Sequence, residues 1–85
     1  MNEGQIYDRI HDLVNDAFAH WDKWTQHERA YTTLQTWRAY ELLKDETMKR
    51  HAFSKIYTHQ RLYTNILRMF GDYDDYGGGR NVLVQ

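Results

Sequence analysis

The chain has 85 residues, a formal net charge of −1, 13 aromatic side chains and neither cysteine nor proline. This length allows one domain, and the missing cysteines exclude disulfides, thiolate zinc sites, iron–sulfur clusters and a cysteine nucleophile. No segment resembles a signal peptide or a membrane span, so we expect a cytoplasmic protein whose apolar surface is carried largely by aromatic rings.

The first predicted element is a helix over residues 3–22. Asn2 and Gln5 form a capping-box pattern at its start. Apolar residues follow at steps of three and four, which places them on one stripe of the helix. A row of acids occupies the opposite face: Asp8, Asp12 and Asp16. This row is either a solvated face or a docking surface that steers a basic partner protein.

The second predicted helix covers residues 26–44, and Thr25 with Glu28 forms a second capping box at its start. Its apolar residues fall on two sides rather than on one. Such a helix is either central in a bundle or partly covered by a partner. We therefore predict that three of its residues anchor a partner protein: Trp37, Tyr40 and Leu43.

The third predicted helix spans residues 47–70, with Asp45 or Thr47 as its cap. Its apolar stripe has nearly heptad spacing. His59 lies on this stripe, where we expect a partly buried, hydrogen-bonded histidine rather than a metal ligand. Gly71 directly follows the stripe, at the place where a left-handed residue commonly ends a helix.

Together these helices predict an all-α fold, a small antiparallel three-helix bundle over residues 1–70. Residues 71–85 differ in composition, because they are acidic and aromatic and then contain three consecutive glycines. We expect them to form a Gly-rich, partly flexible tail. Within it, Tyr73 and Tyr76 are two further candidate partner-binding residues.

Charge is segregated along the chain. Residues 1–22 carry a net charge of −4, residues 23–70 carry +5 and residues 71–85 carry −2. Four residues share one stripe of the third predicted helix: Arg50, Tyr57, Arg61 and Arg68. This stripe is either a solvated face or a row that follows the phosphates of a nucleic acid, with the tyrosine stacking on a base.

The sequence shows no catalytic or metal-binding motif. No two of its histidines stand at a metal-ligand spacing, and no serine is placed beside a base. We therefore expect no enzyme activity, no metal and no cofactor.

The leading hypothesis is a small protein-binding module of the adaptor or inhibitor type, such as viruses and mobile elements encode as accessory proteins. One alternative is nucleic-acid binding through the arginine stripe. The other is a self-assembling structural subunit, because the third predicted helix and the apolar segment 82–84 both suit contacts between copies.

Overall fold

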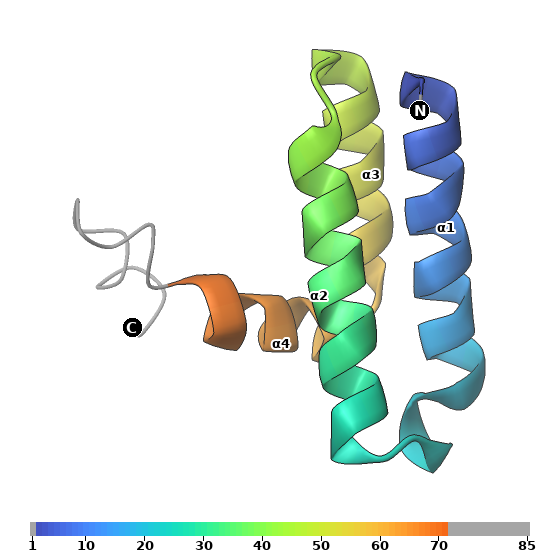
Figure 1. Ribbon diagram of the computed structural model, residues 1–85, viewed down its shortest axis with the longest axis vertical. Helices are drawn as coiled ribbons and strands as arrows, with labels where there is room; N and C mark the ends of the chain where they lie inside the picture. The colour runs from blue at the N-terminus through green and yellow to red at the C-terminus, as the bar shows by residue number, and fades with distance from the viewer. Residues whose placement is uncertain (1, 72–85) are drawn as a thin grey trace.

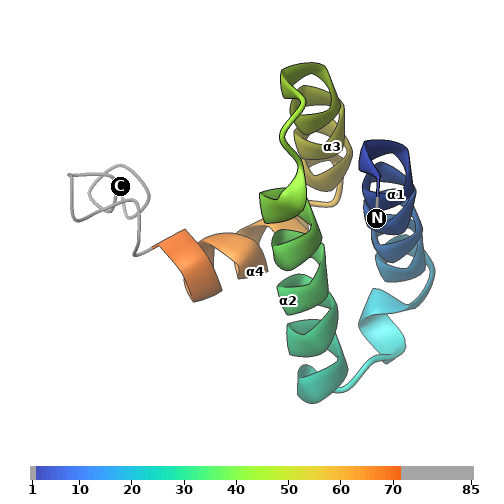
Figure 2. The ribbon, with the colours of Figure 1, turned by 45° about the horizontal axis from the view of Figure 1, so that its top comes forward.

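A computed structural model of the protein describes residues 2–71, and within them every regular element is helical. The elements are α1 (Glu3–His20), the 3₁₀ turn η1 (Trp21–Lys23), α2 (Gln26–Leu42), α3 (Glu46–Thr58) and α4 (Gln60–Phe70). α2 runs antiparallel to both α1 and α3, and α4 crosses these three helices and projects sideways (Figure 1). Figure 2 shows the same arrangement after a rotation. The predicted all-α class is confirmed, whereas Tyr73, Tyr76 and the rest of the predicted tail beyond Gly71 lie outside the described residues.

Local side-chain caps determine where the helices begin. The Asn2 side chain accepts from the Gln5 amide at 2.8 Å, and the Gln5 side chain accepts from the Asn2 amide at 3.1 Å. Thr25 and Glu28 form the same reciprocal pair at 3.2 and 2.8 Å. The side chain of Asp45 caps α3. Both predicted capping boxes are therefore confirmed. Of the two caps predicted for the third helix, Asp45 and Thr47, the structure shows Asp45.

The ends of the helices differ from the prediction. The first helix ends at His20, where the chain tightens into η1, and α2 ends at Leu42 rather than at residue 44. Gly71 does follow α4, but its φ of −64° and ψ of −24° are right-handed. The predicted left-handed stop at Gly71 is therefore wrong.

The single helix predicted over residues 47–70 is also wrong, because the chain breaks at His59. This residue has φ −100° and ψ 95°, and its Nδ1 accepts from the Leu62 amide at 3.1 Å, which caps α4. Because the chain breaks there, the two halves of the predicted apolar stripe pack against different helices. α3 packs against α1, and α4 packs against α2. The structure is thus a bundle of three helices, α1, α2 and α3, with neighbours in sequence antiparallel, and α4 lies across this bundle.

The core follows the stripe of α1 and the apolar faces of the other helices. It consists of Ile6, Ile10, Val14, Ala17, Trp21, Ala39, Leu43, Ala52, Ile56, Leu62 and Ile66. Among the half-buried rings that pack against this cluster are Trp24, Tyr63 and Phe70. Trp21 belongs to the cluster itself.

Threonines form most of the buried face of α2. Thr32, Thr33 and Thr36 are all buried. The hydroxyl of Thr33 donates to the Arg29 carbonyl at 2.7 Å, and that of Thr36 donates to the Thr32 carbonyl at 2.8 Å. These bonds remove the cost of burying two hydroxyls. The apolar residues of α2 fall on two sides because the buried face between them consists mainly of threonines.

A long-range contact joins the start of α1 to the turn between α2 and α3. The backbone amides of Lys44 and Asp45 donate to one carboxylate oxygen of Glu3, at 2.9 and 3.0 Å. These two bonds lower the pKa of Glu3 below its ordinary value.

Candidate functional site

Six aromatic side chains from three helices meet where α4 crosses the bundle, and we call this group the aromatic corner. Its members are Trp37, Tyr40, Phe53, Tyr57, Tyr63 and Phe70. Each ring has a neighbour whose centroid lies 5.0 to 6.5 Å away. These separations fall in the range in which aromatic pairs attract each other beyond simple burial. The corner is therefore one continuous ring network.

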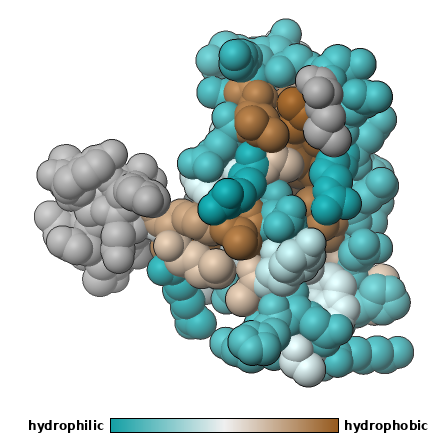
Figure 3. Space-filling view, in the orientation of Figure 1, coloured by the Kyte–Doolittle hydropathy of each residue, from teal (hydrophilic) through white to brown (hydrophobic). Residues whose placement is uncertain are grey.

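The aromatic corner is partly open to solvent. Phe53 is 41% exposed and Tyr57 is 50% exposed. Beside them is a groove of about 160 Å³, lined by Trp37, Phe53, Tyr63, Ile66, Leu67, Phe70 and Gly71. Hydrophobic side chains gather along α4 where it leaves the bundle (Figure 3). A cavity of this volume holds a group about the size of benzene, so the groove can accept one apolar side chain.

Two polar groups of the aromatic corner are affected by burial. Trp37 Nε1 is buried, and no hydrogen-bond acceptor for it exists within the described residues. Such an unsatisfied donor costs about 1–3 kcal/mol, so an acceptor that reaches it is favoured. Burial raises the pKa of the Tyr40 hydroxyl, and the charge of Glu46 raises it further. Tyr40 therefore stays neutral across the physiological pH range.

The structure separates the predicted partner anchors. Trp37 and Tyr40 both belong to the aromatic corner, although each is half-buried. Leu43 is only 1% exposed and lies in the core, so it is not available as an anchor. The sequence reasoning missed Phe53, which lies off the predicted apolar stripe. The signal that could have identified it is its spacing of four from Tyr57, because i, i+4 residues are neighbours on a helix.

The acidic row lies apart from the aromatic corner. Asp8, Asp12 and Asp16 are exposed on α1. All residues of the corner and of its groove come from α2, α3, α4 and the position after it. A partner seated in the corner therefore meets no side chain of this row within the groove itself.

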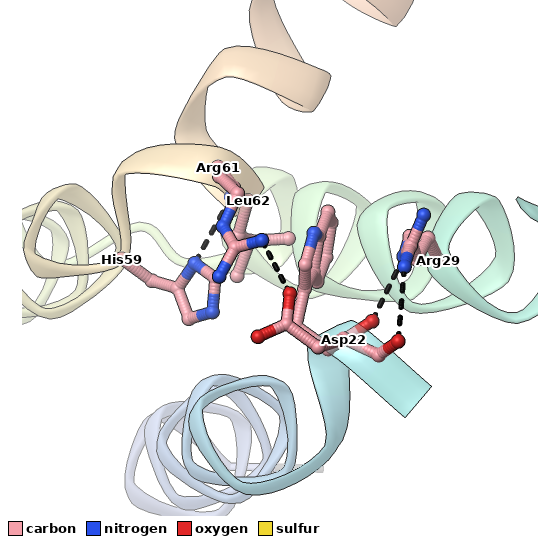
Figure 4. A network of polar contacts seen from close by, with 6 residues as sticks. Asp22, Arg29, His59, Arg61 and Leu62 are labelled. Atoms are coloured by element: carbon pink, nitrogen blue, oxygen red, sulfur yellow. Dashed lines mark hydrogen bonds and ion pairs between the residues drawn. The ribbon is translucent and has the colours of Figure 1, made fainter. Parts of the chain in front are cut away.

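The predicted arginine stripe is not a single row. The break at His59 leaves Arg50 and Tyr57 on α3 and places Arg61 and Arg68 on α4, which runs in another direction. In addition, Arg61 forms an ion pair with Asp22 (Figure 4). The structure therefore corrects the prediction of a continuous basic stripe along one helix.

The ion pair between Arg61 and Asp22 predicts how the free energy of unfolding changes at acidic pH. The hydrogen bond and the charge of Arg61 lower the pKa of Asp22 below its ordinary value of 3.8. A carboxyl with a lowered folded-state pKa adds stability above its ordinary pKa, and this contribution is lost as the pH falls through the lowered value. We expect Asp22→Asn to flatten the decline in unfolding free energy below about pH 4, measured by urea unfolding at several pH values.

Asp16→Asn is the matched control for that experiment. It removes an exposed carboxylate of α1 that forms no ion pair within residues 2–71. Equal acid profiles for the two variants would contradict a specific contribution from the Asp22 carboxyl.

The described residues contain neither a membrane-spanning helix nor a group of three or more side chains that could hold a metal ion. Comparison with protein-family models, with curated proteins and with solved structures gave no match.

Proposed function

We propose that the protein is a small protein-binding module that seats an apolar side chain of a partner in the aromatic corner. The observation that carries this proposal is a continuous ring network that stays partly open around a groove of side-chain size. Tryptophan and tyrosine contribute strongly to protein interfaces because they bury a large area with few rotatable bonds. By occupying the partner's surface, the module acts as an adaptor or an inhibitor does.

The charge beside the aromatic corner indicates what the partner carries. Together α3 and α4 hold five basic residues and one acidic residue, Glu46 at the start of α3. Arg50 is exposed on α3 and precedes Phe53 by three residues and Tyr57 by seven, so the three share a face. We therefore expect the partner's apolar side chain to be flanked by carboxylates.

A double variant at the exposed rim of the corner tests this proposal. Phe53→Ser with Tyr57→Ser removes two rings that are 41% and 50% exposed, so we expect the variant to fold, and far-UV circular dichroism checks this. We expect the partner's Kd to rise by at least about tenfold, the effect of one lost interface hot spot. The partner is first captured by a photo-crosslinking residue at position 57, identified by mass spectrometry, and then titrated against each variant.

A matched control is available outside the groove. Tyr31 is 59% exposed and Leu42 is 58% exposed, and neither lines the groove of the aromatic corner. Tyr31→Ser with Leu42→Ser also removes two exposed apolar side chains from the surface. If both double variants weaken binding equally, or if the captured partner contacts position 57 through a basic polar segment, the proposal is wrong.

The native mass separates a partner protein from a second copy. We expect the isolated protein to remain a monomer at increasing concentration in light scattering. A dimer that dissociates in the Phe53→Ser, Tyr57→Ser variant would overturn the proposal in favour of self-assembly through the corner.

A further inference from the structure

A second groove lies between the start of α2 and the outer side of α4, and we call it the arginine groove. It has a volume of about 290 Å³ and is lined by Trp21, Gln26, Arg29, Arg61, Thr64, Asn65 and Arg68. Three arginines and three residues with an amide or hydroxyl group therefore line one space. No carboxylate is among the lining residues. This composition is that of an anion site rather than of an apolar docking surface.

Arg29 is the fixed part of the arginine groove. Its Nε donates to the Trp21 carbonyl at 2.8 Å, and its Nη2 donates to the Asp22 carbonyl at 3.4 Å. Its guanidinium carbon lies 5.7 Å from the centroid of the Trp21 ring. These contacts hold the side chain while leaving its charge unneutralised, since no carboxylate pairs with Arg29 within the described residues. A positioned, half-buried cation of this kind favours a bound anion.

Arg68 supplies the second uncompensated charge. It stands seven residues after Arg61, two turns along the same face of α4. Arg68 is exposed and has no carboxylate partner in residues 2–71, whereas Arg61 is paired with Asp22. In Figure 4 the Asp22 carboxylate bonds to Arg61, whereas Arg29 bonds to the backbone carbonyls of Trp21 and Asp22, so this one carboxylate is paired with Arg61 alone. The arginine groove therefore keeps an excess of two positive charges.

We infer that the arginine groove binds a phosphate monoester in its dianionic form. Two uncompensated guanidinium groups match a charge near −2, and their fork-like donors suit the oxygens of a phosphate. The hydroxyl of Thr64 and the amide of Gln26 provide further donors on the walls. A nucleic-acid strand fits less well, because a strand needs a continuous track and Arg50 lies on a different helix. This inference concerns a different surface from the aromatic corner and does not rest on the proposed function.

An NMR titration with phenyl phosphate tests the arginine groove. We expect the Nε–Hε signals of Arg29 and Arg68 to shift with saturation. Arg68→Gln is expected to raise the Kd about tenfold or more, because a hydrogen bond to a charged group contributes about 1.5–3 kcal/mol. Arg68 is exposed, so this variant retains the fold, which far-UV circular dichroism verifies. Arg50→Gln makes the same change of charge outside the groove and is expected to leave the Kd unchanged.

A second variant gives a gain of binding that a merely structural role would not produce. Asp22→Asn removes the carboxylate that occupies Arg61, and we expect it to tighten phenyl phosphate binding. The inference is overturned if Arg50→Gln weakens binding as much as Arg68→Gln, or if no shift occurs up to about 10 mM phenyl phosphate. It is also overturned if only a single-stranded oligonucleotide binds, with a salt dependence that reports four or more phosphate contacts.

Discussion

Trp21→Ala is expected to lower the free energy of unfolding by about 3–5 kcal/mol, the usual cost of deleting a buried tryptophan. Trp21 is buried in η1, the turn that connects α1 to α2. Its ring centroid lies 5.1 Å from that of His59 and 6.2 Å from that of Trp24. An 85-residue domain has a total stability of about 4–13 kcal/mol, so the loss of this ring removes a large fraction of it.

Urea unfolding followed by far-UV circular dichroism measures this effect, because the substitution itself changes tryptophan fluorescence. Trp21→Phe is the first control, since it keeps a ring against His59 and should cost clearly less. Trp24→Ala is the second control, because Trp24 is only half-buried. A loss below about 1 kcal/mol for Trp21→Ala would show that the ring is not central to the core.

His59→Ala is expected to cost about 2–4 kcal/mol, the sum of a lost helix cap and a lost buried ring. The His59 Nδ1 is the acceptor that caps α4, at 3.1 Å from the Leu62 amide. The same ring is packed between Phe18 and Trp21, at centroid distances of 4.7 and 5.1 Å. The histidine therefore stabilises both the break between α3 and α4 and the packing of α4 onto the bundle.

His59→Asn separates these two contributions. Asparagine retains a capping acceptor but not the ring, so we expect a loss of stability smaller than that of His59→Ala. Alanine also favours a helical backbone, so the Cα chemical shifts of residues 58–60 should move toward helical values in His59→Ala. Equal stabilities of the alanine variant and the natural protein would contradict a role of His59 in holding the break.

The sequence by itself predicts the helical class and the positions at which helices begin. Asn2 with Gln5 and Thr25 with Glu28 act across three residues, so their pairing depends only on neighbouring chain. The buried stripe of α1 is local in the same sense, because residues three and four apart lie on one face whatever surrounds them. The buried state of His59 also follows from its place on an apolar stripe.

The candidate sites depend on contacts between residues far apart in the sequence. The aromatic corner needs rings from α2, α3 and α4, and the arginine groove brings Arg29 to Arg61 and Arg68 across more than thirty residues. Spacing along a single predicted helix grouped Arg61 with Arg50 instead. The burial of Leu43 was equally hidden, because its place in the core is set by the packing of the bundle and not by its neighbours in sequence.

The break at His59 is the feature that only the tertiary structure decides. Residues 47–70 contain no glycine or proline, so local preference favours one uninterrupted helix. The bend breaks helical backbone hydrogen bonds around His59, and the His59 side chain replaces one of them by accepting from the Leu62 amide. In return, the bend buries Leu62 and Ile66 against the rest of the molecule. Burial of two such side chains contributes about 3–6 kcal/mol, which exceeds the local preference. Local chemistry therefore determined that this chain is helical, and the burial of apolar surface between distant segments decided how its helices meet.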